Sequence, residues 1–377
     1  MAMNLPELGE LREHSFEIGP IRPPSEGGSH SLLIRATRNC PWNLCKFCYG
    51  TPYNREKFQL RTVAEIKKDI DSAKIISSLI KAISEKMGGL DWVARMIDPT
   101  LLHNKDLSKL KQNELENSKS VLNVFNWLCS GGKSAFLQDA NSLIMPTSGL
   151  VEVTKHLKET FPSLERITSY ARAKTLVQKS RAMDELRKLR KVGLTRLHVG
   201  LETGDNDLLY YVNKGVTGEE QVLAGKRAKK AGFELSEYWM PGLGGRAMSE
   251  QHARNTAKAL SAIDPDFVRS RRFVPRKGTP LHEEWKKGRF QLLAPHEELR
   301  EIKMMIENLE MTGKVCFDHF INPAYRGDYR SIWLFRQDYE GYRFPEEKPE
   351  VLDQIRFGLG IDESRYIRAE DLVGMSL

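Results

Sequence analysis

Short strand patterns alternate with helical patterns along most of this 377-residue chain, and this alternation limits its possible folds more than any other feature. The β-branched or aromatic runs lie at residues 31–37, 134–140, 166–171, 196–202, 234–240 and 267–274. Helical patterns follow at 62–76, 148–161, 180–193, 217–232, 249–263 and 295–311. Several begin at Ser or Thr with an acidic residue two or three positions later, as an N-cap requires. The sequence therefore predicts an α/β fold, a partial (β/α)6 TIM-like barrel of parallel strands.

The segments outside this rhythm suggest the domain organisation. Residues 1–30 form an N-terminal extension, and 31–290 form the barrel. Within the barrel, 79–130 separates the first helix from the second strand and reads as a helical insertion. Residues 291–377 form a C-terminal helical extension that caps the core, with one more strand expected after residue 312.

Composition and charge point to an ordinary cytoplasmic protein. No run of about 18 apolar residues could span a bilayer, and the first 20 residues lack the apolar core of a signal peptide. The net charge of +8 gathers in runs typical of solvated helix ends, so a nucleic-acid partner is not required by it. Five cysteines, an odd number with three of them clustered, do not form a disulfide framework.

The clustered cysteines are Cys40, Cys45 and Cys48, in the loop after the first strand pattern. Three thiolates on one loop can bind three irons of a [4Fe–4S] cluster and leave the fourth iron open. A structural zinc needs a fourth ligand, which only His30 or the distant Cys129 or Cys316 could supply. We otherwise expect Cys129 and Cys316 to be buried filler.

This loop resembles the signature of the radical S-adenosylmethionine (SAM) superfamily, although its first gap has four residues in place of the usual three. Phe47 precedes the last cysteine, as an aromatic or apolar residue does in that family. The segments GLETGD, MPGLGG and RRFVPRKGTPL, each after a strand pattern, are similar to those of oxygen-independent coproporphyrinogen oxidases and methylthiotransferases. The resemblance covers roughly residues 30 to 290.

The resemblance implies an enzyme with two cofactors, a [4Fe–4S] cluster on the three cysteines and SAM on the open iron. An electron from a donor such as flavodoxin or ferredoxin cleaves SAM, and the resulting 5′-deoxyadenosyl radical takes hydrogen from the substrate. We expect that substrate to be a small anionic molecule.

The resemblance also suggests which residues bind SAM. Asp139 and Asn141 stand where the family holds the methionyl amine, although Asp139 could instead cap the next helix. Arg172 suits a carboxylate, and Glu202 suits a ribose hydroxyl or an ammonium; each could equally form an ion pair. Gly242 and Gly244 would let the backbone approach the adenine, with Phe47 against its edge, and Val274 is a further candidate for cofactor binding.

Substrate residues are expected on the later strands. His198 is a proton donor or a core histidine, and Asp318 with His319 could be catalytic, metal-binding or structural. Arg269, Arg271 and Arg272 cannot all face a sheet unpaired, so at least one should meet an anion. That anion is either a group on the substrate or a barrel acid such as Glu237.

Two other classes of function remain open at this point. One is radical SAM modification of tRNA or protein, as methylthiotransferases perform, but the chain has no cysteines for a second cluster. The other is non-catalytic, an iron–sulfur electron carrier or a zinc-stabilised scaffold. Metal content separates these readings, because the enzyme requires about four irons per chain and the scaffold one zinc.

Overall fold

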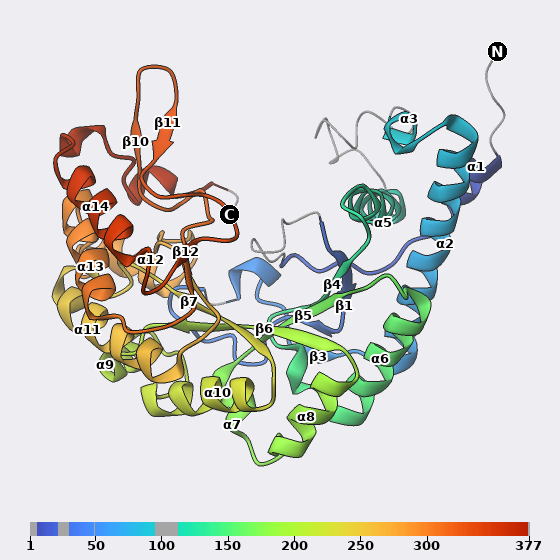
Figure 1. The fold of residues 1–377 in the computed structure, drawn as a ribbon, viewed down its shortest axis with the longest axis horizontal. Coiled ribbons are helices and arrows are strands. Elements are labelled where there is room, and N and C mark those ends of the chain that lie inside the picture. Colours follow the sequence, from blue (N-terminus) through green and yellow to red (C-terminus); the bar gives the residue numbers. More distant parts are fainter. Residues whose placement is uncertain (1–5, 22–29, 49, 95–111, 376–377) are drawn as a thin grey trace. The chain divides into compact units, whose positions relative to one another are not determined.

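The computed structural model describes residues 6–21, 30–48, 50–94 and 112–375. Parts of the predicted N-terminal extension (1–5 and 22–29) and of the predicted insertion (95–111) lie outside these described residues. The chain divides into two compact units, and Figure 1 labels the helices and strands named below. The first comprises residues 1–38, 58–170 and 188–195, and the second comprises 39–57, 171–187 and 196–377.

Three parallel strands form the sheet of the first unit, in the order β1 (Leu32–Arg35), β4 (Ser134–Gln138) and β5 (Arg166–Ala171). Two helices pack together beside them, α2 (Val63–Met87) and α6 (Thr147–Thr160). Thr62 and Glu65 form a capping box that starts α2, and Gly88 ends it in a left-handed conformation. The buried side chains include Leu32, Ile34, Ile66, Ile70, Phe136, Leu150 and Ile167.

The described part of the insertion is helical, as predicted, and it covers the outer edge of β1. Its helices are α3 (Leu90–Ala94) and α5 (Gln112–Cys129). From α5, Asn123 accepts a hydrogen bond from Leu33 N (3.0 Å) and donates one to Ser31 O (3.0 Å). This buried amide satisfies backbone groups that an edge strand would otherwise leave unpaired.

The second unit carries the later strand–helix pairs. Its parallel strands run in the order β6 (Leu194–Glu202), β7 (Glu234–Trp239), β8 (Phe267–Ser270) and β9 (Lys314–Cys316). The first two residues of β6 belong to the first unit, and the rest of the strand belongs to the second. At the edge, β12 (Tyr342–Arg343) pairs with β9 antiparallel. The helices are α9 (Asn206–Tyr211), α10 (Gly218–Lys230), α11 (Gly245–Ile263), α12 (Pro280–Lys286), α13 (Pro295–Asn308) and α14 (Lys348–Leu359).

Smaller elements complete the chain. The helices are α1 (Pro6–Leu11), α7 (Ala173–Val177) and α8 (Met183–Lys191), with 3-10 turns at Thr51–Tyr53, Ser142–Ile144, Glu363–Arg365 and Glu370–Leu372. Two short antiparallel ladders join β2 (Thr37–Arg38) to β3 (Gln59–Leu60) and β10 (Ala324–Arg326) to β11 (Ser331–Trp333).

The predicted fold class is confirmed, since all six strand–helix units of the expected partial barrel are present and the strands are mostly parallel. Two helix boundaries differ from the prediction by four or more residues. The first helix continues to Met87 because no breaker precedes the Gly88–Gly89 pair. The helix expected from Ser249 begins at Gly245, because the Ser249 hydroxyl donates to the buried Glu301 carboxylate (2.5 Å) and caps nothing. Within the described residues no helix is long and apolar enough to cross a membrane.

A buried histidine joins the ends of β6 and β7 to α11. His252 Nε2 donates to Met240 O (3.0 Å), and its Nδ1 accepts from Thr203 Oγ1 (2.8 Å). Both contacts suit a neutral ring, and burial lowers the pKa of His252 to about 4.

Acid should therefore destabilise the protein through His252. Because its folded pKa lies below the ordinary value of 6.5, the stabilising contribution is complete above pH 6.5 and is lost as the pH falls towards 4. We expect the free energy of unfolding to fall by up to about 3 kcal/mol through this residue, and this pH-dependent fall to be absent in His252→Gln. Urea unfolding of both proteins across this pH range measures it. Parallel stability curves for wild type and variant would contradict the assignment.

Candidate functional site

The three cysteines lie on the loop of residues 39–57, in the second unit, and the loop is fastened by its backbone. Lys46 N donates to Val212 O (2.8 Å), and Leu281 N donates to Lys46 O (3.1 Å). Within the loop, Cys48 N donates to Cys45 O (3.1 Å) and Thr51 N to Cys48 O (3.0 Å), so the last two cysteines share one turn. These bonds fix the cysteine backbone against segments following β6 and β8.

Trp42, inside the four-residue gap, is a second anchor of the loop. Its indole Nε1 donates to Asn213 O (2.7 Å), and the Arg172 guanidinium lies over its ring at 5.1 Å. The ring packs on Gly215, whose φ is +72°; a Cβ there would lie 2.6 Å from Trp42 Cε2. Gly215 is therefore required both by its backbone conformation and by the indole.

The thiols are half-buried and surrounded by positive charge. Burial raises the pKa of Cys45 to about 12, against the opposing charges of Lys214 and Arg172. Burial also raises the pKa of Cys48, opposed by Arg276 and Lys214. Metal ligation must therefore displace protons from these thiols, and the neighbouring cations favour the thiolate form that binds metal.

Lys214 connects the loop to the end of β6. Its ammonium forms an ion pair with Glu202 (2.9 Å) and lies 5.6 Å from the centre of the Phe47 ring. Glu202 has a φ of +62°, and the strand register shifts between Gly200 and Glu202. The Glu202 carboxylate folds back over Gly200, where a Cβ would overlap it. The bulge thus turns Glu202 towards the loop.

A buried acid lies near this ion pair. Glu237 on β7 is almost fully buried, and its Oε2 has no hydrogen-bond partner within the described part of the chain. Burial raises the pKa of Glu237 well above its usual range, with Lys214 opposing and Glu202 reinforcing the shift. Desolvation therefore favours the protonated form of the Glu237 carboxyl group.

The glycines predicted to surround the adenine lie in the turn after β7. Gly242 has a φ of +81°, and its N–H donates to Glu301 Oε1 (2.6 Å). A Cβ at Gly244 would lie 3.1 Å from Met248, so a side chain there would be tightly packed against the first turn of α11. Phe47 packs against the apolar cluster that contains Leu243 and Phe273. Their contacts with SAM stay predictions.

Of the remaining predicted SAM and substrate residues, Val274 and His198 are both buried. Val274 packs with Ile321 and Leu372. The His198 ring lies 5.9 Å from that of Tyr238, within the core of the second unit. Their roles in SAM binding and proton transfer stay predictions.

The three arginines predicted to meet anions have separate environments. Arg269 forms a buried ion pair with Asp318, and Arg272 forms one with Glu298 (2.7 Å), so neither pairs with Glu237. Arg271 Nη2 donates to His319 Nε2 (3.1 Å). Burial and the charges of Arg271 and Arg276 lower the pKa of His319 to about 3, so this imidazole is neutral.

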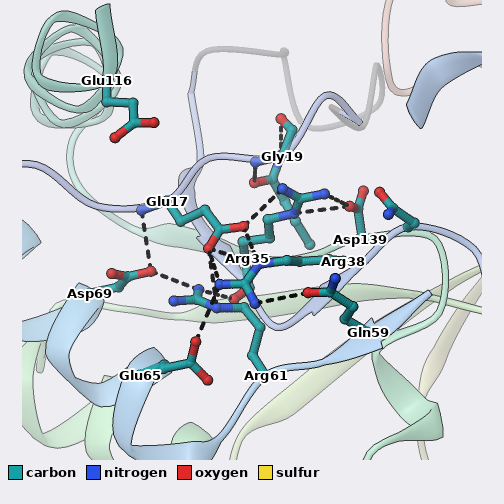
Figure 2. Close-up of polar contacts among 12 residues, drawn as sticks. Glu17, Gly19, Arg35, Arg38, Gln59, Arg61, Glu65, Asp69, Glu116 and Asp139 are labelled. Atoms are coloured by element: carbon teal, nitrogen blue, oxygen red, sulfur yellow. Dashed lines mark hydrogen bonds and ion pairs between the residues drawn. The ribbon is translucent and has the colours of Figure 1, made fainter. Parts of the chain in front are cut away.

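Asp139 and Asn141 belong to the first unit, where both are buried. Asp139 Oδ2 accepts two hydrogen bonds from Arg35 (3.1 and 2.8 Å) (Figure 2). Arg35 also binds Glu17, which in turn pairs with Arg38, as Figure 2 shows. The SAM contacts of Asp139 and Asn141 stay predictions, and Arg35 is a partner that the sequence did not single out.

This network continues into a polar cavity of about 520 Å³ in the first unit. Arg61 pairs with Asp69 (2.7 Å) at its wall, and Asp69 also accepts from Glu17 N (3.2 Å). Positive and negative side chains in the lining balance one another, so the cavity has no excess charge to select an anion or a cation.

Sequence reasoning missed Trp42, Lys214 and Arg276 and misplaced Cys129. The first three lie in or beside recognised motifs, but only the folded chain brings them to the thiols. Cys129 is exposed rather than buried because it is the last residue of α5, whereas Cys316 is buried as expected. Among the described residues no three His, Cys, Asp or Glu side chains are grouped as ligands of one metal ion. A [4Fe–4S] cluster places its three thiolates on three different irons.

Replacing Gly215 should loosen the cysteine loop. In Gly215→Ala the φ strain costs about 1 kcal/mol, and displacement of Trp42 adds on the order of 1–3 kcal/mol. Gly288→Ala is the matched control, because Gly288 also has a positive φ of +70° but nothing lies within 4 Å of its Cβ position. Tryptophan fluorescence and iron retention after anaerobic reconstitution should change only in Gly215→Ala. Equal behaviour of the two variants would contradict the anchoring role of Trp42.

Comparison with known proteins gives partial similarities. No family model matches the chain. It is 29% identical to a tRNA uridine(34) acetyltransferase of Methanocaldococcus jannaschii over 123 residues, 32% of this chain and 22% of that protein. It is 31% identical to a biotin synthase of Maridesulfovibrio salexigens over 128 residues, 31% of this chain and 37% of that protein. The chain thus matches less than two fifths of the length of either relative.

Among solved structures, methylornithine synthase is 19% identical with a TM-score of 0.41, covering 81% of this chain and 69% of that one. The radical SAM enzyme coproporphyrinogen III oxidase of Escherichia coli is 16% identical with a TM-score of 0.37, covering 46% and 39%. These superpositions are loose. The two sequence similarities each cover about a third of this chain, and its cysteine loop resembles that of the radical SAM superfamily.

Proposed function

We propose that this protein is a radical SAM enzyme that abstracts hydrogen from a small anionic substrate. The observation that carries the proposal is the loop of three cysteines, fastened by backbone hydrogen bonds and faced by Arg172, Lys214 and Arg276. A loop that only filled the core would have no need of three cations beside its thiols, because desolvating charge is costly.

The donor set fits an iron–sulfur cluster with one open iron. Cys40, Cys45 and Cys48 are three ligands of the soft type that iron–sulfur clusters require. When bound, the cluster and SAM together supply the electron transfer and the 5′-deoxyadenosyl radical that removes hydrogen from the substrate. Arg172, Lys214 and Arg276 would offset the negative charge of the thiolates.

The residues around the loop would orient SAM. Glu202 Oε1 is held by Lys214, and Oε2 makes no hydrogen bond within the described residues, so it can accept from a ribose hydroxyl or an ammonium. Arg172, which donates to Lys214 O (2.7 Å), would bind the SAM carboxylate. Phe47 and the Gly242 turn would flank the adenine.

The substrate would lie beyond these residues, near the ends of β8 and β9. His319 is neutral, and its one acceptor nitrogen receives the hydrogen bond from Arg271, whereas Asp318 serves the Arg269 ion pair. We therefore assign Asp318 a positioning role. An external donor such as flavodoxin or ferredoxin would reduce the cluster.

The decisive test is SAM cleavage. Anaerobically reconstituted protein should hold about four irons per chain and release 5′-deoxyadenosine with dithionite and SAM. Cys45→Ser should abolish this release by removing one cluster ligand. Cys129→Ser is the matched control, because Cys129 is exposed on α5 and should leave both iron content and product unchanged. A protein with an intact cluster that releases no 5′-deoxyadenosine sinks the proposal, and a content of one zinc would favour a scaffold.

A second candidate is radical SAM modification of tRNA. It is favoured by the similarity to the tRNA uridine(34) acetyltransferase and by the net charge of +8. The similarity covers 32% of this chain, so it leaves open whether tRNA is bound.

Salt dependence of tRNA binding tests this candidate. If tRNA is the substrate, a gel shift with the reconstituted protein should weaken steeply, by on the order of a hundredfold or more between low and physiological salt. Absence of a shift at low salt would exclude tRNA and leave the small-molecule substrate.

A further inference from the structure

The arginines at and after β8 divide into two classes. Arg269 and Arg272 are buried and each is neutralised by a carboxylate, Asp318 and Glu298 respectively. Arg271 and Arg276 are only half-buried, and neither has a carboxylate within ion-pair distance among the described residues. Alternation along an extended chain does not explain this division, because it places Arg269 and Arg271 on one face although only Arg269 forms an ion pair.

Packing between two segments brings Arg271 and Arg276, the two arginines without a carboxylate partner, close to His319. Ser270 and Asn322 exchange two hydrogen bonds (both 3.1 Å), and Val274 packs on Ile321. Segment 270–276 is thereby fixed beside segment 319–322. The Arg276 carbonyl accepts from Thr279 N (3.1 Å) and Oγ1 (2.8 Å), which fixes the turn that presents the Arg276 side chain.

The two guanidinium groups repel each other, and nothing nearby offsets them fully. Both lie close enough to act electrostatically on His319, and Arg271 acts on Arg276. The acidic groups in range are Cys48, which faces Arg276 and is negative only as a thiolate, and Asp318, which is already paired with Arg269. Holding like charges together in a desolvated place costs free energy that a bound anion would recover.

We propose that Arg271 and Arg276 form the binding site for a carboxylate group of the substrate, with His319 orienting Arg271. The inference rests on the proposed function, because it assigns the anion to the substrate of that reaction. Arg271 donates one hydrogen bond to His319 Nε2, and because the guanidinium group is planar this bond fixes the direction of its other N–H donors. A planar guanidinium fork matches a carboxylate, and a site that faces Cys48 places that carboxylate beside the cysteine loop.

Arginine-selective labelling with phenylglyoxal tests this site on the cluster-loaded protein, with each arginine followed by peptide mass spectrometry. The probes are acetate, its neutral counterpart acetamide, and inorganic phosphate, at equal ionic strength and with or without SAM. Acetate should slow the labelling of Arg271 and Arg276 at least about threefold, with or without SAM, because it binds charge-assisted donors. Acetamide should not, and the exposed Arg300 should label at one rate throughout.

Variants extend the test. In Arg276→Gln, the acetate concentration that gives half-maximal protection of Arg271 should rise about tenfold, because one charged donor is lost. Arg276→Lys should retain part of it. Lys277→Gln is the matched control, since it removes a neighbouring but exposed positive charge and should leave protection unchanged. Iron content and circular dichroism confirm that each variant is folded.

Several results would overturn the assignment. Equal protection by acetate and acetamide would exclude recognition of charge, and protection by phosphate alone would assign a phosphate. If SAM alone protects the two arginines and acetate then adds no further protection, the site binds the carboxylate of SAM and not that of the substrate. The proposed function fails separately: protein that shows acetate protection but releases no 5′-deoxyadenosine retains an anion site without the radical reaction.

Discussion

The hydrogen bonds that fasten the cysteine loop are the constraint on which the rest of the site depends. Three thiols can present a fixed ligand set only if the backbone between them is fixed, and a loop with no regular structure has few internal bonds to do this. Here Lys46 bonds to Val212 and Leu281, and Trp42 bonds to Asn213. The cysteines therefore inherit their positions from the ends of the neighbouring strand–helix units, which carry a well-packed core.

Positively charged side chains lie around this loop, and carboxyl groups lie deeper in the second unit. Cations face the thiols, while the acids deeper in the second unit are desolvated, and burial raises the pKa of Glu301 to about 8. An acid that stays neutral does not compete with the thiolates for the cations. The Glu202–Lys214 pair lies beside the loop, and its exposure of 13% on each side lets it keep its charges at modest desolvation cost.

Much of the fold could be predicted from the sequence, because strand and helix periodicity is local and every predicted strand–helix unit is present. The cysteine cluster was equally visible in the sequence, since its spacing alone limits the chemistry, and its role as a ligand set stays a prediction. The partners of charged residues were not, because ion pairs such as Arg269–Asp318 and Arg272–Glu298 join segments far apart in the chain. For the same reason Arg276 passed unnoticed within a recognised motif, and the exposure of Cys129 depended on where α5 ends.

The short ladder between β2 and β3 gives the loop a closed base, because Arg38 pairs with Gln59 and Thr37 with Leu60 on either side of it. A change in loop length is then absorbed between two joined ends and is not passed on to the register of β1. The four-residue gap between Cys40 and Cys45 is an example, since it contains Trp42, whose indole anchors the loop. A loop built this way can gain residues during evolution as new attachment points, while the strands that support it stay unchanged.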